Sequence, residues 1–496
     1  MKRLILGSLV LGTLVTAAGC FGSFKESICD YANGQACDGG QLPDGTLPDG
    51  PVVPEASTDA KPDADPIPTD CTTPTDPVKN LEKCLVDSFG VFVSPTGDDT
   101  KDGSKANPFK TIGKALGTTR SRIVVCEGEY AGSLDVARAV EIYGGVACDF
   151  AKAGAKAKIV ASKPAYGLKV SKVTGAVILA DLDIVGMNAA APSESSVGVF
   201  ASESADVKVL RSRVEAGDGA DAPAKKDGAF SMAAQAPKGG DAAGNTGGAA
   251  GSSGVCAGGG TSIGGKGGDL GNLGDDGAPR PPGGAKGAGT SDCGLMGTGL
   301  SGMVGTPGAD RSGATTLGSL TPSGLTGSSG QDATAGSIGG GGGGGFGFAG
   351  AGGAGGAGGC GGQGGFGGAA GGSSVALLVF ASEVSLEGTE LVAKNAKPGG
   401  SGGSGQSGQM GGFRGNGSGN ACNGGGGAAG GTGGNAGGGA GGIAAGIVWS
   451  TGKEPKRDGT TKITRPTAAA PAGGEGGGGA ATKGIDGVHA DVFEVK

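Results

Sequence analysis

Glycine makes up 118 of the 496 residues, about a quarter of the chain against a usual share of about 7%. Much of it follows a strict period, because residues 350–368 repeat Gly-Gly-x, with the variable position filled by Ala351, Ala354, Ala357, Cys360, Gln363 and Phe366. Segments without side chains cannot bury a hydrophobic core of their own. Two structures stay open: disordered loops, the usual outcome of this composition, or an ordered array of threefold extended helices whose backbones bond to one another.

The rest of the composition argues against several functions. His489 is the only histidine, so the chain lacks the residues for a histidine-rich metal site or a Ser-His-Asp triad. The net charge of −7 argues against a broad nucleic-acid surface, and no Cys-x-x-Cys pair supports a zinc ribbon. We therefore predict no catalytic residue, no cofactor, no metal site and no nucleic-acid partner.

The first twenty residues are typical of an export signal. Two basic residues precede an apolar stretch over 4–18, which as a helix would rise roughly 22 Å, short of the ~30 Å of a bilayer core. The stretch ends in Ala-Ala-Gly-Cys at Cys20, which resembles the lipobox of bacterial lipoproteins. The resemblance implies that residues 1–19 are removed and that Cys20 is lipidated, and Phe21, in place of the Asp that retains enteric lipoproteins in the inner membrane, favours the outer membrane. The alternative is an ordinary signal peptide followed by a chance cysteine.

Residues 20–85 are expected to form a lipidated, disordered tether. Between 38 and 76 the chain has nine acidic residues and one basic residue, Lys61, with prolines interspersed. Such a segment cannot bury enough apolar surface to fold, and its like charges keep it extended. A calcium or partner site in the acidic stretch is the weaker alternative. We expect the protein to be exported and anchored in the outer membrane, facing the periplasm or the cell surface.

Ten cysteines remain once Cys20 is set apart, an even number in an exported chain, where disulfides persist. Pairing each cysteine with its neighbour in the sequence gives five candidate disulfides: Cys29 with Cys37, Cys71 with Cys84, Cys126 with Cys148, Cys256 with Cys293, and Cys360 with Cys422. A bond between Cys360 and Cys422 would require two separate glycine-rich stretches to pack together, so we favour partial order there. For Cys126 and Cys148, two separate buried thiols are the alternative.

The most specific motif in the chain is Pro-Phe-Lys-Thr-Ile-Gly-Lys-Ala-Leu at 108–116. Together with Val-Ser-Pro-Thr-Gly-Asp at 93–98, it resembles the opening of many bacterial pectin-lyase-like proteins, which are right-handed parallel β-helices. The resemblance implies an all-β fold, a solenoid of stacked parallel coils. Phe109, Ile112 and Leu116 lie at helical spacing and can cover the open end of the first coil.

An internal repeat supports the stacking of coils. Gly-Val-Phe-Ala-Ser-Glu at 198–203 returns as Leu-Val-Phe-Ala-Ser-Glu at 378–383, and the strands that follow also match. Repeats of this length cannot bury a face alone, so they must stack. The alignment predicts two ladders across neighbouring coils, a serine ladder of Ser171, Ser202, Ser382 and Ser450, and a charged ladder of Asp183, Arg213 and Glu390 with Asp181 and Arg211 beside it.

The charged ladder has two interpretations. In pectate lyases, which share the fold that the resemblance implies, acidic residues hold calcium and a basic residue removes a proton, which would nominate Asp181, Asp183 and Arg213. Opposite charges on neighbouring strands also pair at ~0.2–1 kcal/mol and set the register of the strands. We expect structural pairing here and no catalysis.

The glycine-rich stretches all enter at one turn of the repeat, so they should leave the solenoid on one side as a lateral lobe. Their texture resembles the glycine-rich domains of PGRS-type proteins. The expected order is a signal peptide at 1–19, the tether at 20–85, the cap and first coils at 86–216, an insertion at 217–373, a coil at 374–393, an insertion at 394–443, and the last coils with a short glycine-rich loop at 444–496.

The expected function is that of a non-enzymatic cell-surface lipoprotein, a structural or adhesive β-helix that presents a glycine-rich lobe. Its expected contacts are the membrane, through Cys20, and envelope or matrix polysaccharide or surface proteins. The alternative is a carbohydrate-binding or polysaccharide-degrading protein of the pectate-lyase type. Sugar sites usually present aromatic platforms, whereas Trp449 is the only tryptophan and the tyrosines are scattered.

Overall fold

The computed structural model describes residue 71, residue 77 and residues 80–496 except 295. Contacts divide the chain into Met1–Asp63 and Ala64–Lys496, and every described residue belongs to the second unit. Within the described part, no helix is long and apolar enough to cross a membrane.

Several predictions concern residues outside the described part of the chain. The predicted lipidation site Cys20 and most of the 20–85 tether lie there. The predicted disulfide between Cys29 and Cys37 also lies outside the described residues. These predictions stay predictions.

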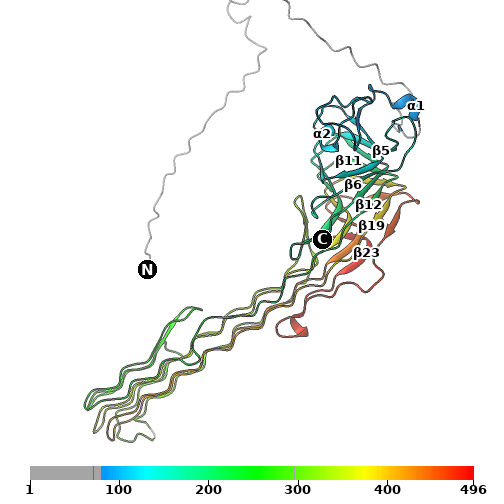
Figure 1. Ribbon diagram of the computed structural model, residues 1–496. Helices are drawn as coiled ribbons and strands as arrows, with labels where there is room; N and C mark the ends of the chain where they lie inside the picture. Colours follow the sequence, from blue (N-terminus) through cyan, green and yellow to red (C-terminus); the bar gives the residue numbers. More distant parts are fainter. Residues whose placement is uncertain (1–70, 72–76, 78–79, 295) are drawn as a thin grey trace, which may run out of the picture. The chain divides into compact units, whose positions relative to one another are not determined.

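The regular structure of the described residues is nearly all β and lies mainly in three parallel sheets (Figure 1). Sheet A contains, in spatial order, β1 (Val91–Val93), β2 (Arg122–Cys126), β5 (Val140–Val146), β8 (Ala176–Ala180), β11 (Asp206–Leu210), β18 (Val384–Glu387) and β21 (Lys456–Arg457). Sheet B contains β3 (Gly128–Ala131), β6 (Ala157–Val160), β9 (Leu182–Val185), β12 (Arg213–Glu215), β19 (Glu390–Val392) and β22 (Lys462–Thr464). Sheet C contains β4 (Leu134–Val136), β7 (Leu168–Ser171), β10 (Ser196–Ser202), β17 (Ser374–Phe380), β20 (Ile443–Ser450) and β23 (Val488–Glu494). The helices are short: α1 (Leu81–Cys84), α2 (Ile112–Leu116) and the 3-10 turn η3 (Ala480–Thr482).

The chain visits the three sheets in rotation. Apart from two hairpins described below, the strands from β2 onward enter sheet A, sheet B and sheet C in turn, and each new strand pairs in parallel with the strand of the same sheet from the previous round. Six such rounds follow one another, from β2–β3–β4 to β21–β22–β23. Equivalent residues of successive rounds therefore lie side by side, at the ~4.8 Å spacing of paired strands.

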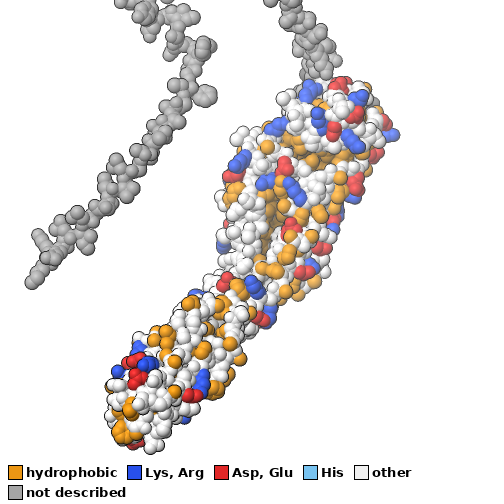
Figure 2. Space-filling view, turned by 60° about the vertical axis from the view of Figure 1, so that its left-hand side comes forward, with side chains coloured by type: hydrophobic (Ala, Val, Ile, Leu, Met, Phe, Trp, Pro, Cys, Tyr) orange, Lys and Arg blue, Asp and Glu red, His pale blue; other side chains and the backbone are white. Residues whose placement is uncertain are grey.

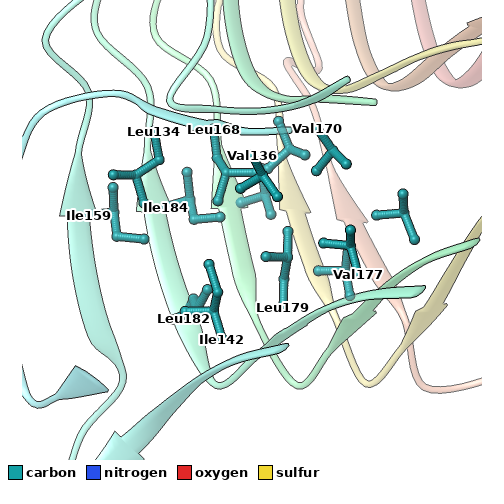
Figure 3. Packing of buried hydrophobic residues seen from close by; sticks show 14 of the residues in the cluster. Leu134, Val136, Ile142, Ile159, Leu168, Val170, Val177, Leu179, Leu182 and Ile184 are labelled. Carbon is teal, nitrogen blue, oxygen red and sulfur yellow. The ribbon is translucent and has the colours of Figure 1, made fainter. Parts of the chain in front are cut away.

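Side chains that face inward form columns of apolar residues (Figure 3). Leu134 lies beside Leu168, and Ile142 lies beside Leu179, and all four are buried. Burying such a side chain stabilises the fold by ~1.5–3 kcal/mol, so these columns supply the main force that holds successive rounds together.

The open end of the first round is covered by α2 and the loop before it. Phe109 and Ile112 are almost fully buried in the same apolar core. The hydroxyl of Thr111 caps α2 by accepting a hydrogen bond from the amide of Lys114, and the carboxylate of Asp99 accepts one from the amide of Thr111 at 2.9 Å. These bonds fix the loop so that its apolar side chains stay over the core.

The serine ladder is only partly as predicted. Ser202 pairs with Ser171 on one side, but on the other side it pairs with Phe380, which in turn pairs with Ser450. Ser382 lies two residues further on, where its hydroxyl accepts a hydrogen bond from a backbone amide at 2.9 Å. The prediction for Ser382 is wrong because a shift of two residues leaves the same side chains facing inward, so the matching motifs do not fix the register.

The middle strands of sheet C, β10, β17 and β20, are buried on both faces. Their inner face lines the core, and their outer face is covered by the hairpin of β15 (Gly318–Thr321) and β16 (Gly324–Gly327). Leu320 of this hairpin belongs to the same apolar cluster as Phe200 and Leu378 of the sheet. Burial on both faces explains why these three strands are nearly continuous apolar runs.

The chain passes six times from a strand of sheet B to the next strand of sheet C, and the last four of these connections are the longest, at residues 186–195, 216–373, 393–442 and 465–487. We call the two long stretches, 216–373 and 393–442, the glycine-rich array. Its segments run side by side away from the sheets (Figure 1), and a small hairpin of β13 (Ser252–Val255) and β14 (Thr261–Ile263) lies within it.

Backbone hydrogen bonds in the array recur every three residues. The amide groups of Gly353, Gly356, Gly359 and their successors donate to carbonyl groups spaced by three along 422–440, a parallel neighbour. The segment that contains Gly353, Gly356 and Gly359 also has two antiparallel neighbours, residues 330–345 and 400–418, which bond to it with the same spacing. An extended helix with three residues per turn makes no internal hydrogen bonds, so it presents its polar groups to neighbours in three directions. The array is therefore an ordered set of extended segments.

Only glycine fits at most positions of these segments. A Cβ atom added to Gly356 would overlap the carbonyl oxygen of Gly412, and one added to Gly359 would overlap that of Gln409. The variable positions of the Gly-Gly-x pattern do accommodate side chains, and Ala354 is fully buried there. The glycine content thus follows from the close approach of neighbouring backbones.

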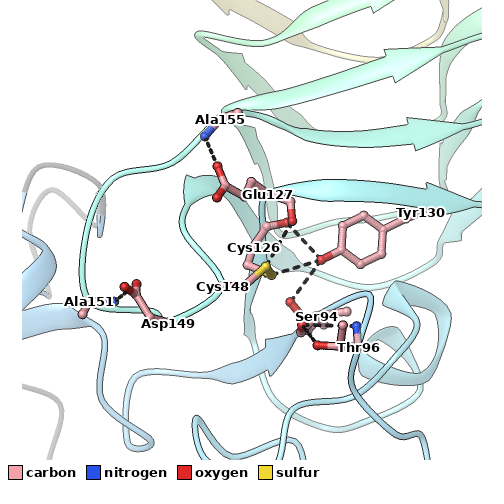
Figure 4. Close-up of a disulfide and its surroundings, with 10 residues drawn as sticks. Ser94, Thr96, Cys126, Glu127, Tyr130, Cys148, Asp149, Ala151 and Ala155 are labelled. Atoms are coloured by element: carbon pink, nitrogen blue, oxygen red, sulfur yellow. Dashed lines mark hydrogen bonds between the residues drawn. A yellow bond between two sulfur atoms is a disulfide. The ribbon is translucent and has the colours of Figure 1, made fainter.

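Two of the expected disulfides are present near the start of the described chain. Cys71 bonds to Cys84, and Cys126 of β2 bonds to Cys148 in the loop after β5. The hydroxyl of Tyr130 lies beside the second bond and donates to the carbonyl of Cys126 at 2.9 Å (Figure 4). Burial raises the pKa of Tyr130, so this hydroxyl keeps its proton and its role as a donor.

The disulfides of the array differ from those expected. Cys256 bonds to Cys360 and Cys293 bonds to Cys422, so the predicted pairing of Cys256 with Cys293 and of Cys360 with Cys422 is wrong. Neighbours in the sequence are not neighbours in space here, because the segments fold back on one another. The Cys293–Cys422 bond joins the two long stretches of the array to each other.

Two adjacent glycines test whether backbone packing holds the array. A Cβ atom at Gly427 would overlap the carbonyl oxygen of Ala357, whereas one at Gly426 would meet no atom closer than 3.8 Å. We expect Gly427→Ala to lower the free energy of unfolding by ~1–3 kcal/mol, as overpacking does, and Gly426→Ala to leave it nearly unchanged. Thermal melts of the two variants measure the difference, and equal melting temperatures would contradict the packing described here.

Candidate functional site

The outward face of sheet B carries one column of charges that alternate in sign. The column runs across six strands, at equivalent positions, through Glu129, Lys158, Asp183, Arg213, Glu390 and Lys462. The predicted ladder of Asp183, Arg213 and Glu390 forms its centre.

Arg213 makes the most contacts in this column. Its Nη1 lies 3.2 Å from Oδ1 of Asp183, and its Nε lies 3.6 Å from Oε2 of Glu390. It also pairs with Glu215, which is two residues further along β12. Glu215 completes the group by accepting from Nζ of Lys394 at 2.6 Å. Opposite charges on three neighbouring strands are thus joined through one guanidinium group.

The pKa values of these groups follow from the geometry. Burial lowers the pKa of Arg213, but hydrogen bonds to Glu215 and Asp183 outweigh it and leave the pKa above its usual value. Burial raises the pKa of Glu215, but hydrogen bonds from Lys394 and Arg213 reverse this effect and hold the pKa below its usual value. Both groups therefore stay charged at neutral pH.

Asp181 and Arg211 form a separate pair at the corner between sheets A and B. Nη2 of Arg211 lies 2.6 Å from Oδ2 of Asp181, and its Nε lies 3.0 Å from Oδ1. Both residues have a positive φ, 55° for Asp181 and 47° for Arg211. The two-pronged ion pair joins these corners of successive rounds and holds them in register.

These contacts favour strand pairing over calcium-dependent catalysis. The structure brings Asp183 and Arg213 together but pairs Asp181 with Arg211 instead. Arg213 would have to lose a proton to act as a base, and the carboxylates around it oppose that loss. Across the described ranges, no group of three or more His, Cys, Asp or Glu side chains is placed to hold a metal ion.

Comparison of the repeats missed three members of the column, Glu129, Lys158 and Lys462. These residues lie in the strands β3, β6 and β22, of the first two rounds and the last one, which the alignment of the repeated motifs does not reach. A local signal was nevertheless present, because each charged residue stands directly before an apolar residue that faces inward, as Lys158 does before Ile159.

A family model described as a protein of unknown function (DUF1565) matches residues 95–181. This part extends from the turn after β1 to the corner before β9 and includes the cap and the first rounds. The match covers less than a fifth of the chain. No curated protein and no solved structure shows significant similarity to this chain.

Replacing Arg213 with glutamate tests the central contact of the column. Arg213→Glu would place a new carboxylate among Asp183, Glu215 and Glu390. Because like charges on adjacent strands repel, we expect a loss of ~1 kcal/mol or more in the free energy of unfolding at low salt. The loss should shrink at high salt, since ions screen partly exposed charges. Thermal melts at two ionic strengths measure both effects.

The matched control is Lys453→Glu. Nζ of Lys453 lies 2.9 Å from Oε1 of Glu383, but both side chains are largely exposed. Exposed pairs contribute little to stability, so the melting temperature of this variant should change little. If Arg213→Glu and Lys453→Glu behave alike, the column does not set the register of sheet B.

Proposed function

We propose that this chain is an exported, lipid-anchored surface protein that catalyses no reaction. In this proposal Cys20 holds the protein in the outer membrane and the tether begins there. The predicted end of the tether at residue 85 is too late, because Cys71, Cys84 and Leu85 are buried in an apolar cluster with Phe92. The three parallel sheets form a right-handed β-helix, from which the glycine-rich array projects as insertions on one side. The array is the part that contacts envelope or matrix polysaccharide or other surface proteins.

Two observations support the β-helix. The strands enter three parallel sheets in rotation and pair with the previous round at every step. The matching family, DUF1565, is often associated with parallel β-helix proteins. A solenoid of this kind is an elongated support, which suits a protein that holds another structure away from a membrane.

The order of the array is the observation that carries the proposal. Its segments are joined by backbone hydrogen bonds at a three-residue period and by the Cys256–Cys360 and Cys293–Cys422 disulfides. A simple linker would need neither. Disulfides persist in oxidising compartments outside the cytoplasm, which supports export. A rigid, cross-linked projection suits the presentation of a surface to a partner.

The charged column supports a role without catalysis. Its central members are engaged with oppositely charged neighbours, and Arg213 is surrounded by carboxylates that keep it protonated. Catalytic acids and bases usually have pKa values shifted toward the pH at which they work, and the shifts of Arg213 and Glu215 run the other way.

Changing the predicted lipidation site tests the anchor. Cys20→Ser should move the protein from the membrane fraction of its native cells to the soluble exported fraction, because no lipid can then be attached. Gly19→Ala is the matched control, since it keeps a small residue before Cys20 and should stay in the membrane fraction. Immunoblots of the two fractions measure the distribution, and Cys20→Ser remaining with the membranes would contradict the proposal.

The soluble Cys20→Ser protein also tests the presenting role. Added to cells that lack the native protein, it should bind to their envelope. With acidic polysaccharide and calcium it should release no unsaturated product. Failure to bind, or release of such a product, would each count against a non-enzymatic surface protein.

A further inference from the structure

One edge of the glycine-rich array is open. We call residues 299–308 the array edge. Its amide groups bond to 423–432 and to residues 282 and 285, and its carbonyl groups accept from 337–343. The central segment at 351–371 has neighbours on every side, including 330–345, 400–418 and 422–440, whereas the array edge leaves one side free.

The backbone of the array edge keeps unused donors at the period of the array. The amide groups of Ser301 and Val304 have no hydrogen-bond partner within the described chain, and both residues are exposed. The next position in this row is Pro307, which has no amide hydrogen to satisfy. The unused groups therefore lie in one row, at the spacing that neighbouring segments use for pairing elsewhere in the array.

The side chains of the array edge are uncharged, and its three largest apolar ones are exposed. Leu300, Met303 and Val304 are 60%, 64% and 67% exposed. Large exposed apolar residues are concentrated on the array, while Met187 and Ile485 are the others among the described residues. Figure 2 shows this mixture of hydrophobic and white surface on the projecting part of the molecule.

The lack of charge extends from the array edge to its neighbour on one side. No charged residue occurs from 293 to 309 or from 415 to 452, and the second of these stretches includes the neighbouring segment at 423–432. The neighbour on the other side, residues 282–285, lies between Arg280 and Lys286, so the uncharged surface consists of the array edge and its 423–432 side. A neutral partner with its own row of backbone donors and acceptors fits this surface.

Another copy of the array edge has these properties. Segments of this array already pair in both directions, since 353–371 runs parallel to 422–440 and antiparallel to 330–345. The carbonyl groups of Ser301, Gly302 and Val304 accept no backbone hydrogen bond within the described chain. Two array edges can therefore meet antiparallel about a twofold axis near Val304, each donating its unused amides to unused carbonyl groups of the other, and the like residues that come together carry no charge. Exposed rows of unpaired backbone groups are ready templates for pairing with another chain.

From this we infer that the array edge, residues 299–308, binds the array edge of a second copy of this chain. The contact would extend the threefold packing across two molecules and cover Leu300, Met303 and Val304. The inference rests on the proposed role of the array as a presenting surface, but not on lipidation at Cys20. The first binding partner of the array is then another copy of this protein.

Sedimentation velocity on the full purified chain, kept in detergent, tests this contact across a wide range of protein concentration. The wild-type protein should shift from monomer to dimer as its concentration rises. In Val304→Glu two carboxylates face each other across the twofold contact, so we expect the dissociation constant to rise by more than about tenfold. Met187→Glu is the matched control, because it places the same charge on an exposed apolar residue outside the array, and it should dimerise like the wild type.

Circular dichroism melts establish that both variants are folded, as expected for substitutions at exposed positions. A wild-type protein that remains monomeric at every concentration would overturn the inference, as would equal effects of Val304→Glu and Met187→Glu. Binding of the protein to the cell envelope is measured separately, so a monomer that still binds the envelope would refute the self-contact and leave the proposed function standing.

Discussion

Backbone hydrogen bonds join neighbouring passes of the chain in the sheets and in the array alike. In the three sheets they join successive rounds, and side chains alternate between the core and the outside. In the array they recur every three residues and leave room for almost no side chains. Both parts meet one requirement, that every buried amide and carbonyl group finds a partner. The sheets meet it with stacked apolar columns such as Leu134 and Leu168, and the array meets it with glycine.

Buried serines connect the two kinds of packing where the array leaves the sheets. The hydroxyl of Ser374 donates to the carbonyl of Gly217 at 2.7 Å and accepts from the amide of Lys394 at 2.8 Å. The hydroxyl of Ser196 accepts from the amide of Gly217 at 2.7 Å. These side chains replace strand partners at the points where regular pairing ends. The β15–β16 hairpin then returns to cover the outer face of sheet C, so the array also protects apolar residues of the sheets.

Sequence reasoning succeeded where one local pattern determines the contact. The charged ladder of Asp183, Arg213 and Glu390 was predictable because each residue stands directly before an inward-facing residue. The short strands that contain the three residues, β9, β12 and β19, pair in the register that the sequence alignment gives. Ser382 was misplaced because strand alternation cannot distinguish registers that differ by two residues. The array disulfides were mispaired because a uniform glycine pattern carries no signal for where the chain reverses. The β15–β16 hairpin was missed although the sequence Pro322-Ser323-Gly324, where the two short strands meet, is a turn signal.

Hydrogen exchange of the backbone amides measures the central claim most directly. If cross-chain hydrogen bonds hold the array, the amides of Gly356, Gly359 and Gly362 should exchange as slowly as those of the sheets. The amides of Ser301 and Val304, which lack partners in a single molecule, should exchange fast at low protein concentration. Rapid exchange throughout 351–371 would contradict the account, because it would mean that the glycine segments do not hold one another in place.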